Sequence, residues 1–224
     1  MLAVSLDGRL APPAGGAAQL GGAGDRRALE EALAWADAAL LGAETLRRHG
    51  STCLIHAPDL LAARGGQGRS AQPTALVLSR SGHIPPGLPF WRQPLQRWWL
   101  QPAGRPSEHD QPAHPEPGPR PRMLPGCDRV LAFSSWVQLR SALAAEGLRR
   151  LVLLGGADLA GQLLAAEQVD ELQLTLCPLL LGGPHSWLPP SLGLRLSHWQ
   201  LLEQRPLGGD ELLLRYLRRP VPVP

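Results

Sequence analysis

Short apolar runs and helical spacings alternate through the first half of the chain. Residues 2–5 form an apolar run that stops at Asp7-Gly8, and a loop rich in Gly, Ala and Pro follows through Gly24. An amphipathic helix is predicted next, because apolar residues recur at the i, i+3, i+4, i+7 spacing of Leu29, Ala32, Leu33 and Ala36. We expect Asp25 to be its N-cap, since a carboxylate can accept hydrogen bonds from the free N–H groups of the first turn.

Two further apolar runs have the length and bounds of buried strands. Residues 38–41 are closed by Gly42, and residues 74–78 lie between Pro73 and the tripeptide Ser79-Arg80-Ser81. Residues 44–48 and 59–63 have the composition of short helical turns.

The pattern is more regular after residue 129. A strand is predicted at residues 130–133, and Ser134 or Ser135 can cap the helix that follows. That helix carries Trp136, Leu139 and Leu143 on one face and ends near Gly147, a residue type common at helix C-termini.

The last third of the chain predicts one more helix and the remaining strands. Residues 151–154 form an apolar run typical of a strand covered on both faces, and a helix through Ala165 follows Gly155-Gly156. Residues 172–181 are another strand region, and residues 194–202 and 211–217 suggest a hairpin around Gly208-Gly209. Strands that alternate with helices, followed by antiparallel strands, indicate an α/β fold with a mixed sheet.

One span departs from this pattern. Residues 102–125 contain eight of the 24 prolines and almost nothing apolar. Proline supplies no backbone N–H, so we expect a surface insertion or disordered loop within a single domain that covers residues 1–224.

Composition excludes several kinds of chemistry. All 22 basic residues are Arg, and the chain contains neither Lys nor Asn. Phosphate-binding loops of the GxxxxGK[ST] type, pyridoxal-phosphate aldimines and Ser-Lys dyads all require a lysine and are therefore excluded. The net charge of +3 comes from scattered arginines, whereas nucleic-acid binding needs a basic patch. Three separated cysteines, no signal peptide and no apolar run of spanning length predict a cytoplasmic protein.

Two segments are candidates for anion binding. The turn Gly155-Gly156 joins a buried strand to a helix that starts with Ala157, Asp158 and Leu159, and such a turn exposes backbone N–H groups at a helix N-terminus. A tight turn without a ligand is the equal alternative, and the charge of Asp158 favours it slightly. Ser79-Arg80-Ser81 can bind a phosphate through charge-assisted hydrogen bonds, although a plain surface turn explains it as well.

Other site motifs are missing. The seven histidines form no HExxH and no ligand spacing with the cysteines, so no metal site is predicted. The chain also lacks the Gly-x-Ser-x-Gly motif of many hydrolases.

Four segments together resemble a known family. The segment Ser5-Leu6-Asp7-Gly8, the segment 37–45, the segment 153–159 and the segment 169–183 resemble, in order, the conserved blocks of the reductase domain of riboflavin biosynthesis. That family has the dihydrofolate-reductase-like fold, a three-layer αβα domain with a mixed, mostly parallel sheet and an antiparallel C-terminal hairpin. The chain starts close to the first of these blocks, so we expect its first strand to be shortened.

The resemblance implies an NADPH-dependent reduction of a pyrimidine ribosylamine phosphate, and a homodimer. The cofactor supplies the hydride and the protein orients it. By position, the residues implied to meet the cofactor are Thr45, Ser79, Arg80, Gly155, Gly156, Ala157, Asp158 and Leu159. Those implied on the substrate side are Ser5, Asp7, His56 and Leu154.

Three positions depart from the family pattern. Leu33 stands where the family carries an Arg, His56 replaces a second Arg, and Leu154 replaces a Glu. The loss of two guanidinium groups weakens the expected binding of a sugar phosphate. A catalytically idle relative that binds a nucleotide or a partner protein is therefore the alternative. A reductase of pterin-like rings is a third hypothesis, for which the sequence identifies no buried carboxylate.

Overall fold

The computed structural model describes residues 1–16, 20–103, 126–188 and 193–219. In chain order its elements are β1 (Leu2–Ser5), α1 (Ala23–Trp35), β2 (Ala38–Gly42), α2 (Ala43–His49), α3 (Pro58–Gly66), β3 (Thr74–Leu78), the 3-10 helix η1 (Pro89–Arg92), β4 (Arg97–Pro102), β5 (Arg129–Phe133), α4 (Trp136–Ala145), β6 (Leu151–Leu153), α5 (Ala157–Ala165), β7 (Glu171–Cys177), β8 (His198–Gly208) and β9 (Glu211–Arg219).

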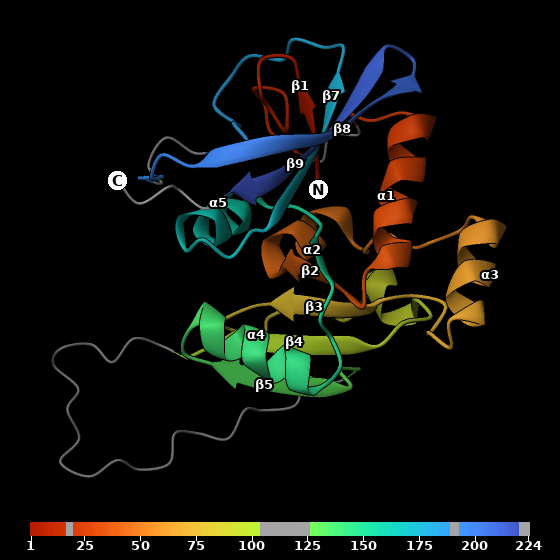
Figure 1. Cartoon of the computed structure of the whole chain (residues 1–224). Coiled ribbons are helices and arrows are strands. Elements are labelled where there is room, and N and C mark those ends of the chain that lie inside the picture. Colours follow the sequence, from red (N-terminus) through yellow and green to blue (C-terminus); the bar gives the residue numbers. More distant parts are fainter. Residues whose placement is uncertain (17–19, 104–125, 189–192, 220–224) are drawn as a thin grey trace, which may run out of the picture.

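The strands form two sheets that meet near the N-terminus (Figure 1). One is entirely parallel, in the order β5-β4-β3-β2-β6. The other has the order β1-β7-β9-β8, with β1 parallel to β7 and the β8–β9 hairpin antiparallel. The Met1 amino group joins the two sheets by donating to the Leu153 carbonyl of β6 at 3.1 Å. The predicted mixed, mostly parallel sheet with a terminal hairpin is confirmed.

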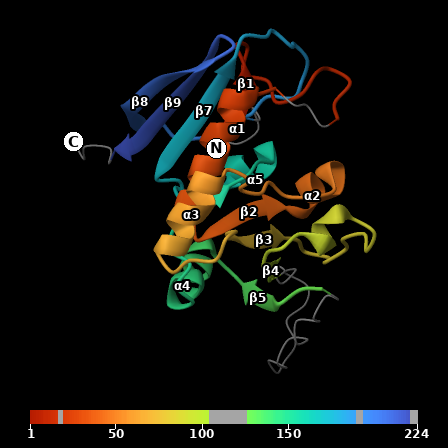
Figure 2. The same cartoon turned by 90° about the vertical axis from the view of Figure 1, so that its right-hand side faces the viewer.

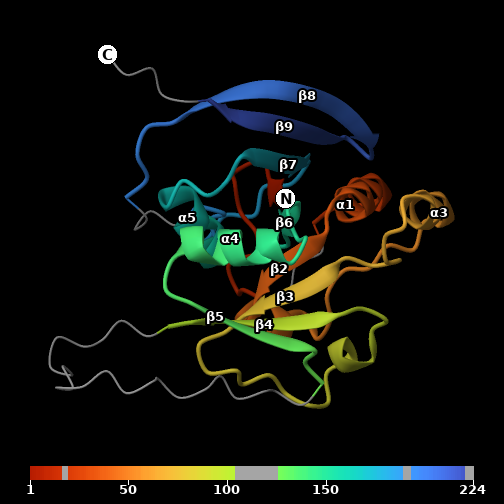
Figure 3. The same cartoon turned by 60° about the horizontal axis from the view of Figure 1, so that its bottom comes forward.

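Successive side chains of the parallel sheet point to opposite faces, and each face packs against helices. Leu40, Leu76 and Leu100 face α4 and α5, where they pack with apolar residues such as Leu139 and Leu163. The intervening residues face the opposite way, toward α1, α2, α3 and η1. In Figure 2, α3 lies in front of α1, with which it is in contact, and Figure 3 shows the β8–β9 hairpin at the end of the molecule remote from β5. The expected three-layer αβα arrangement follows from this alternation.

The predicted N-cap of α1 is wrong. The helix starts at Ala23 with Gly22 as its N-cap, so Asp25 lies inside the first turn. Its carboxylate folds back over Gly21, where a Cβ would come within 2.1 Å of Asp25 Oδ2. The glycines before the helix leave room for this side chain, and the helix therefore begins two residues before Asp25.

The other predicted cap is confirmed. The Ser135 hydroxyl accepts a hydrogen bond from the Gln138 N–H at 3.2 Å at the start of α4. Gly147 follows the end of the helix with a φ of +80°, a conformation that glycine adopts most easily.

The sequence pattern missed strand β4. Its two tryptophans, Trp98 and Trp99, are buried inside the parallel sheet, and the Trp99 indole donates to the Ser79 carbonyl at 2.7 Å. The strand extends through Pro102, and the Ala103 N–H donates to Phe133, so the proline-rich span starts later than expected. Residues 104–125 lie outside the described residues.

Two strand boundaries also differ from the prediction. β7 ends at Cys177 rather than at residue 181, and β8 runs from His198 to Gly208 instead of covering 194–202. Apolar residues on either side of a strand continue the pattern without continuing the hydrogen bonds, which explains both errors.

Candidate functional site

Three neighbouring parallel strands end at the same edge of the five-stranded sheet. β3 ends at Leu78, β2 at Gly42 and β6 at Leu153, and the register pairs Gly42 with Leu78 and Leu40 with Leu153. The loops that follow bring Ser79-Arg80, the start of α2 and the turn Gly155-Gly156 to this edge. Ligands of open α/β sheets bind outside the carboxyl ends of the strands.

The turn before α5 has a backbone that only glycine adopts without strain. Gly155 has a φ of +107° and Gly156 a φ of +93°. A Cβ on Gly156 would lie 3.2 Å from the Thr45 hydroxyl oxygen of α2. The turn and the half-buried Thr45 therefore face each other closely, and a side chain on Gly156 would fill the space between them.

The backbone N–H groups of this turn have no acceptor in the described part of the chain. The first bond of α5 runs from the Ala160 N–H to the Gly156 carbonyl at 2.9 Å. The free N–H groups are those of Gly155, Gly156, Ala157, Asp158 and Leu159. Successive free N–H groups at the N-terminus of a nine-residue helix fit an anionic ligand such as a diphosphate. Asp158 is exposed and Leu159 is buried in the core.

The two polar residues after β3 differ in what their side chains do. The buried Ser79 hydroxyl accepts a hydrogen bond from the Gly82 N–H at 3.0 Å and so shapes the turn. The Arg80 side chain is exposed and forms no hydrogen bond or ion pair with a described residue. Arg80 is therefore the residue of this pair that is available to a phosphate.

Ser5 and Asp7 hold the end of β1 in place. The Ser5 hydroxyl donates to Asp7 Oδ1 at 2.6 Å and accepts from the Arg9 N–H at 2.9 Å. Asp7 also accepts from the N–H groups of Leu181 and Gly182 at 3.1 and 2.8 Å. The Ser5 hydroxyl and these N–H groups hold the pKa of Asp7 well below its usual range. Both carboxylate oxygens already have donors, so Asp7 anchors the loop after β7.

The remaining substrate-side positions are mostly apolar. Leu33 is fully buried and belongs to the same cluster as Ile55 and Leu154. The His56 side chain is exposed, and its backbone N–H donates to Glu30 Oε2 at 2.9 Å. Leucine thus stands on α1, at Leu33, and just after β6, at Leu154, where the family that the sequence resembles carries charge.

Sequence reasoning treated Asp25 only as a helix cap and did not single out Thr175 or Glu211, which lie beside it. Asp25 lies close to Thr175 of β7 and to Glu211 of β9, and one oxygen of each side chain is buried without a hydrogen-bond partner in the described residues. Thr175 and Glu211 are 0% and 7% exposed. The local sequence offered one signal for this group, which is the polar residue Thr175 at a position of β7 that faces the core.

A sequence comparison decides the relationship. The profile of the RibD C-terminal domain matches residues 1–213. The chain belongs to this family. Among curated proteins, no sequence matches it significantly.

Solved structures show the same fold as this RibD C-terminal domain. A pyrimidine reductase-like protein from Corynebacterium diphtheriae superposes with a TM-score of 0.71 at 20% identity, over 98% of this chain and 90% of that one. RibD from Acinetobacter baumannii gives 0.73 at 19% identity over 98% of this chain, which spans 57% of that protein. Dihydrofolate reductase from Enterococcus faecalis gives 0.51 at 14% identity, over 98% and 94%. The dihydrofolate-reductase-like fold is confirmed.

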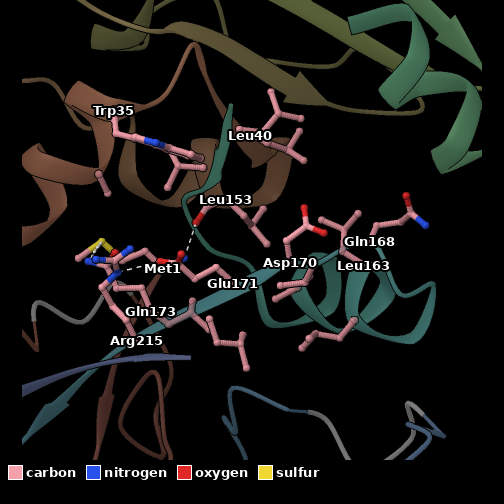
Figure 4. Close-up of a pocket in the computed structure, with 18 of the residues that line it drawn as sticks. Met1, Trp35, Leu40, Leu153, Leu163, Gln168, Asp170, Glu171, Gln173 and Arg215 are labelled. Carbon is pink, nitrogen blue, oxygen red and sulfur yellow. Dashed lines mark hydrogen bonds and ion pairs between the residues drawn. The ribbon is translucent and has the colours of Figure 1, made fainter. Parts of the chain in front are cut away.

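A separate cavity of about 470 Å³ lies where the two sheets of this RibD C-terminal domain meet. Figure 4 shows Leu153 on one side, Glu171 and Gln173 on the other, and Trp35 at one end. β1 pairs with β7 only from Leu174 onward, so the start of β7 has no partner strand on the side of β6. None of the residues discussed for the cofactor lines the cavity, which is therefore a gap in the sheet and distinct from the glycine turn.

The described residues contain neither a membrane-spanning helix nor a cluster of metal ligands. No helix among them is both long and apolar enough to cross a bilayer. In the same residues, no three His, Cys, Asp or Glu side chains gather as they would around a metal ion.

Proposed function

We propose that this chain is an NADPH-dependent reductase that acts on a pyrimidine ribosylamine or a closely related ring. The single observation that carries the proposal is the Gly155-Gly156 turn, whose five consecutive N–H groups from Gly155 to Leu159 have no acceptor in the described residues. Membership of the RibD C-terminal domain family supports the same reaction class.

The residues at the sheet edge fit such a cofactor. The glycine turn would bind its diphosphate through backbone N–H groups, and Thr45 would contact it from the facing helix. The free guanidinium of Arg80 would pair with the 2′-phosphate that distinguishes NADPH from NADH. Bound NADPH supplies a hydride, and the chain contributes its position and the exclusion of water.

The apolar substrate side supports a changed substrate. Each guanidinium absent from a phosphate site removes charge-assisted hydrogen bonds that contribute about 1.5–3 kcal/mol. Leu33 is fully buried and Leu154 packs with Ile55, so neither position offers a charge to a phosphate. We therefore propose a ring substrate whose phosphate, where present, is bound weakly.

A catalytically idle relative that keeps nucleotide binding is the second candidate, because the same apolar positions are compatible with the loss of a substrate. Titration with NADPH, followed by protein fluorescence, tests cofactor binding. The absence of binding at millimolar concentration would end the reductase proposal. NADPH oxidation in the presence of the deaminated ribosylaminopyrimidine phosphate tests the substrate half. Binding without turnover on any ring substrate would favour the idle relative.

We also propose that the chain forms a homodimer. Leu201, Leu202 and Leu217 on the β8–β9 hairpin are each more than a third exposed, and an interface between two copies would cover such apolar side chains. Light scattering should give twice the 24.0 kDa chain mass. A monomer at micromolar concentration would contradict this part of the proposal.

A further inference from the structure

Two strand edges face each other across the cavity of about 470 Å³ with no strand between them in the described part of the chain. One edge belongs to β6, which pairs only with β2. The other belongs to residues 171–173 of β7, because β1 reaches β7 only from Leu174 onward. Figure 4 shows Leu153 of the first edge opposite Glu171 and Gln173 of the second. An unpaired strand edge is a template for another extended segment, and here two such edges border one cavity.

The backbone groups of both edges point into the gap. The Leu154 N–H donates to a carbonyl of β2 at 2.9 Å, so Leu153, the residue before it, points its N–H and C=O to the other side. The Arg218 N–H of β9 likewise donates to the Asp170 carbonyl at 2.8 Å, so the backbone of Glu171 points away from β9. Buried backbone groups normally have partners, and a segment between the two edges would supply them on both sides.

Met1 occupies the place where such a segment would join β1. Its amino group donates to the Leu153 carbonyl at 3.1 Å, and its sulfur accepts from the Gln173 side chain at 3.4 Å, so one residue spans both edges. Burial lowers the pKa of this amino group to about 6. A peptide bond at the same nitrogen would keep an N–H donor for Leu153 and remove the buried charge. The gap beyond Met1 therefore has the width of one strand and the polarity of a backbone.

The two faces of the gap are apolar. Leu139 and Leu163 line it from α4 and α5, and Ala32 and Trp35 line it from α1. The arginines that β8 and β9 contribute are already in ion pairs with glutamates. Side chains of an extended segment alternate between the two faces, and both sets would meet apolar residues here. The gap therefore fits an uncharged extended peptide rich in Val, Ile and Leu, as in a parallel strand covered on both sides.

We infer that the gap is a binding site for an extended apolar peptide segment that is joined to the Met1 nitrogen, lies parallel to β7 and pairs with both edges. Three residues match the length of β6 and of the unpaired start of β7, about 10 Å at about 3.3 Å per residue. A second consequence rests on the proposed function. β6 leads through Leu154 to the Gly155-Gly156 turn, so a segment that pairs with the free edge of β6 also fixes the proposed cofactor site.

Tethered extensions test the site directly. About five residues of Val and Ile, preceded by an initiating Met, are added before Met1, and the control extension of the same length has Pro at alternate positions, which removes N–H donors. We expect the apolar extension to raise the melting temperature by at least about 4 °C over the control. Hydrogen exchange of the backbone at residues 151–153 and 171–173 should slow at least about tenfold. Equal melting temperatures would overturn the inference, as would a rise without slower exchange at these residues.

A cavity-filling substitution shows whether the extension acts through this gap. Ala32→Trp places an indole in the gap from α1, so the apolar extension should raise the melting temperature of this variant by less than about 1 °C. Ala63→Trp is the control, because Ala63 is exposed on α3 and does not line the cavity. The full gain in Ala32→Trp would mean that the extension binds elsewhere, which contradicts the inference.

The free peptide tests the attachment at Met1. At a concentration equal to that of the protein it should leave the melting temperature unchanged, because only the tethered segment has a high effective concentration at the gap. Stabilisation by the free peptide and none by the tethered form would overturn the assignment of a segment joined to Met1.

Cofactor titration separates this inference from the proposed function. NADPH should bind the chain with the apolar extension at least about fivefold more tightly than the chain with the proline control. Equal affinities, with the difference in melting temperature intact, would overturn the link to the glycine turn alone. If the apolar extension stabilises the chain but no form binds NADPH, the reductase proposal fails and the gap site stands. If NADPH binds and the two extensions have equal melting temperatures, only the gap site fails.

Discussion

Two regions of this molecule have unpaired polar groups of opposite kind. At the β6–α5 turn, five backbone N–H groups from Gly155 to Leu159 have no acceptor among the described residues. At the start of α1, three oxygens of Asp25, Thr175 and Glu211 have no donor there. Buried or half-buried polar groups in folded proteins are normally satisfied, so both regions depart from the usual pattern.

The two regions differ in the charge that they favour. The donor-rich turn fits the negative charge of a cofactor, whereas the acceptor-rich group holds two carboxylates close together and disfavours an anion. β1 lies between them, and the polar residues at and just after its end, Ser5 and Asp7, are already paired.

The largest effect is expected from a substitution that blocks the donor-rich turn. Gly156→Val places a branched side chain against Thr45 and in the approach path of the diphosphate, so NADPH affinity should fall at least about 100-fold, or about 2.8 kcal/mol. Calorimetric titration measures the loss. Gly147→Ala is the control, because Gly147 also has a positive φ but no atom within 4 Å of its Cβ position. Unchanged affinity in Gly156→Val would remove the anion site.

A smaller effect is expected at the exposed arginine after β3. Arg80→Ala should weaken NADPH about 10- to 100-fold, because a charge-assisted bond to phosphate contributes about 1.5–3 kcal/mol. NADH, which lacks the 2′-phosphate, should bind equally well to both proteins. Equal losses for NADPH and NADH would show that Arg80 does not contact that phosphate.

Asp25 and Asp7 should affect stability with opposite dependence on pH. The pKa of Asp25 is raised, so its contribution to stability is present below the usual Asp range and is lost as the pH rises. Asp25→Asn should therefore stabilise the protein by on the order of 1 kcal/mol at pH 8, and less at pH 4. The pKa of Asp7 is lowered, so its contribution is present at neutral pH and is lost on acidification.

Urea unfolding across the pH range measures this contrast. Asp7→Asn should destabilise the protein at pH 7, and the difference from the wild type should shrink as the pH falls. The same pH dependence in both variants would contradict the assignment of one carboxylate as satisfied and the other as unpaired.

The smallest effect is expected at Thr175. Thr175→Val keeps the shape and removes a hydroxyl that has no hydrogen-bond partner in the described residues, so the unfolding free energy should change by less than about 1 kcal/mol and tend upward. Thr74→Val, at a buried threonine whose hydroxyl faces Gln96, serves as the comparison. A loss above about 2 kcal/mol at Thr175 would mean that its hydroxyl is bonded after all.

The sequence by itself determined most of the fold. Local periodicity gave the parallel strands, and the adjacent glycines at 155 and 156 identified the turn whose positive φ values only glycine adopts easily. It failed at β4, where two tryptophans between Arg97 and Gln101 leave no long aliphatic run. It also failed at the first turn of α1, where three glycines around Ala23 allow an earlier start than Asp25 indicated.

Only the tertiary structure decided how the polar groups are used. Ser5 and Asp7 carried the family signature, yet their side chains are occupied by each other and by the loop after β7. Asp25, Thr175 and Glu211 are far apart in sequence and form no motif. Antiparallel pairing brings Thr175 of β7 close to Glu211 of β9, and the Gly22 N–H, which donates to Glu211 Oε1, holds the start of α1 with Asp25 beside them. Periodicity predicts which face of an element a residue occupies. Whether its polar groups are hydrogen-bonded depends on residues distant in the chain, which local periodicity does not predict.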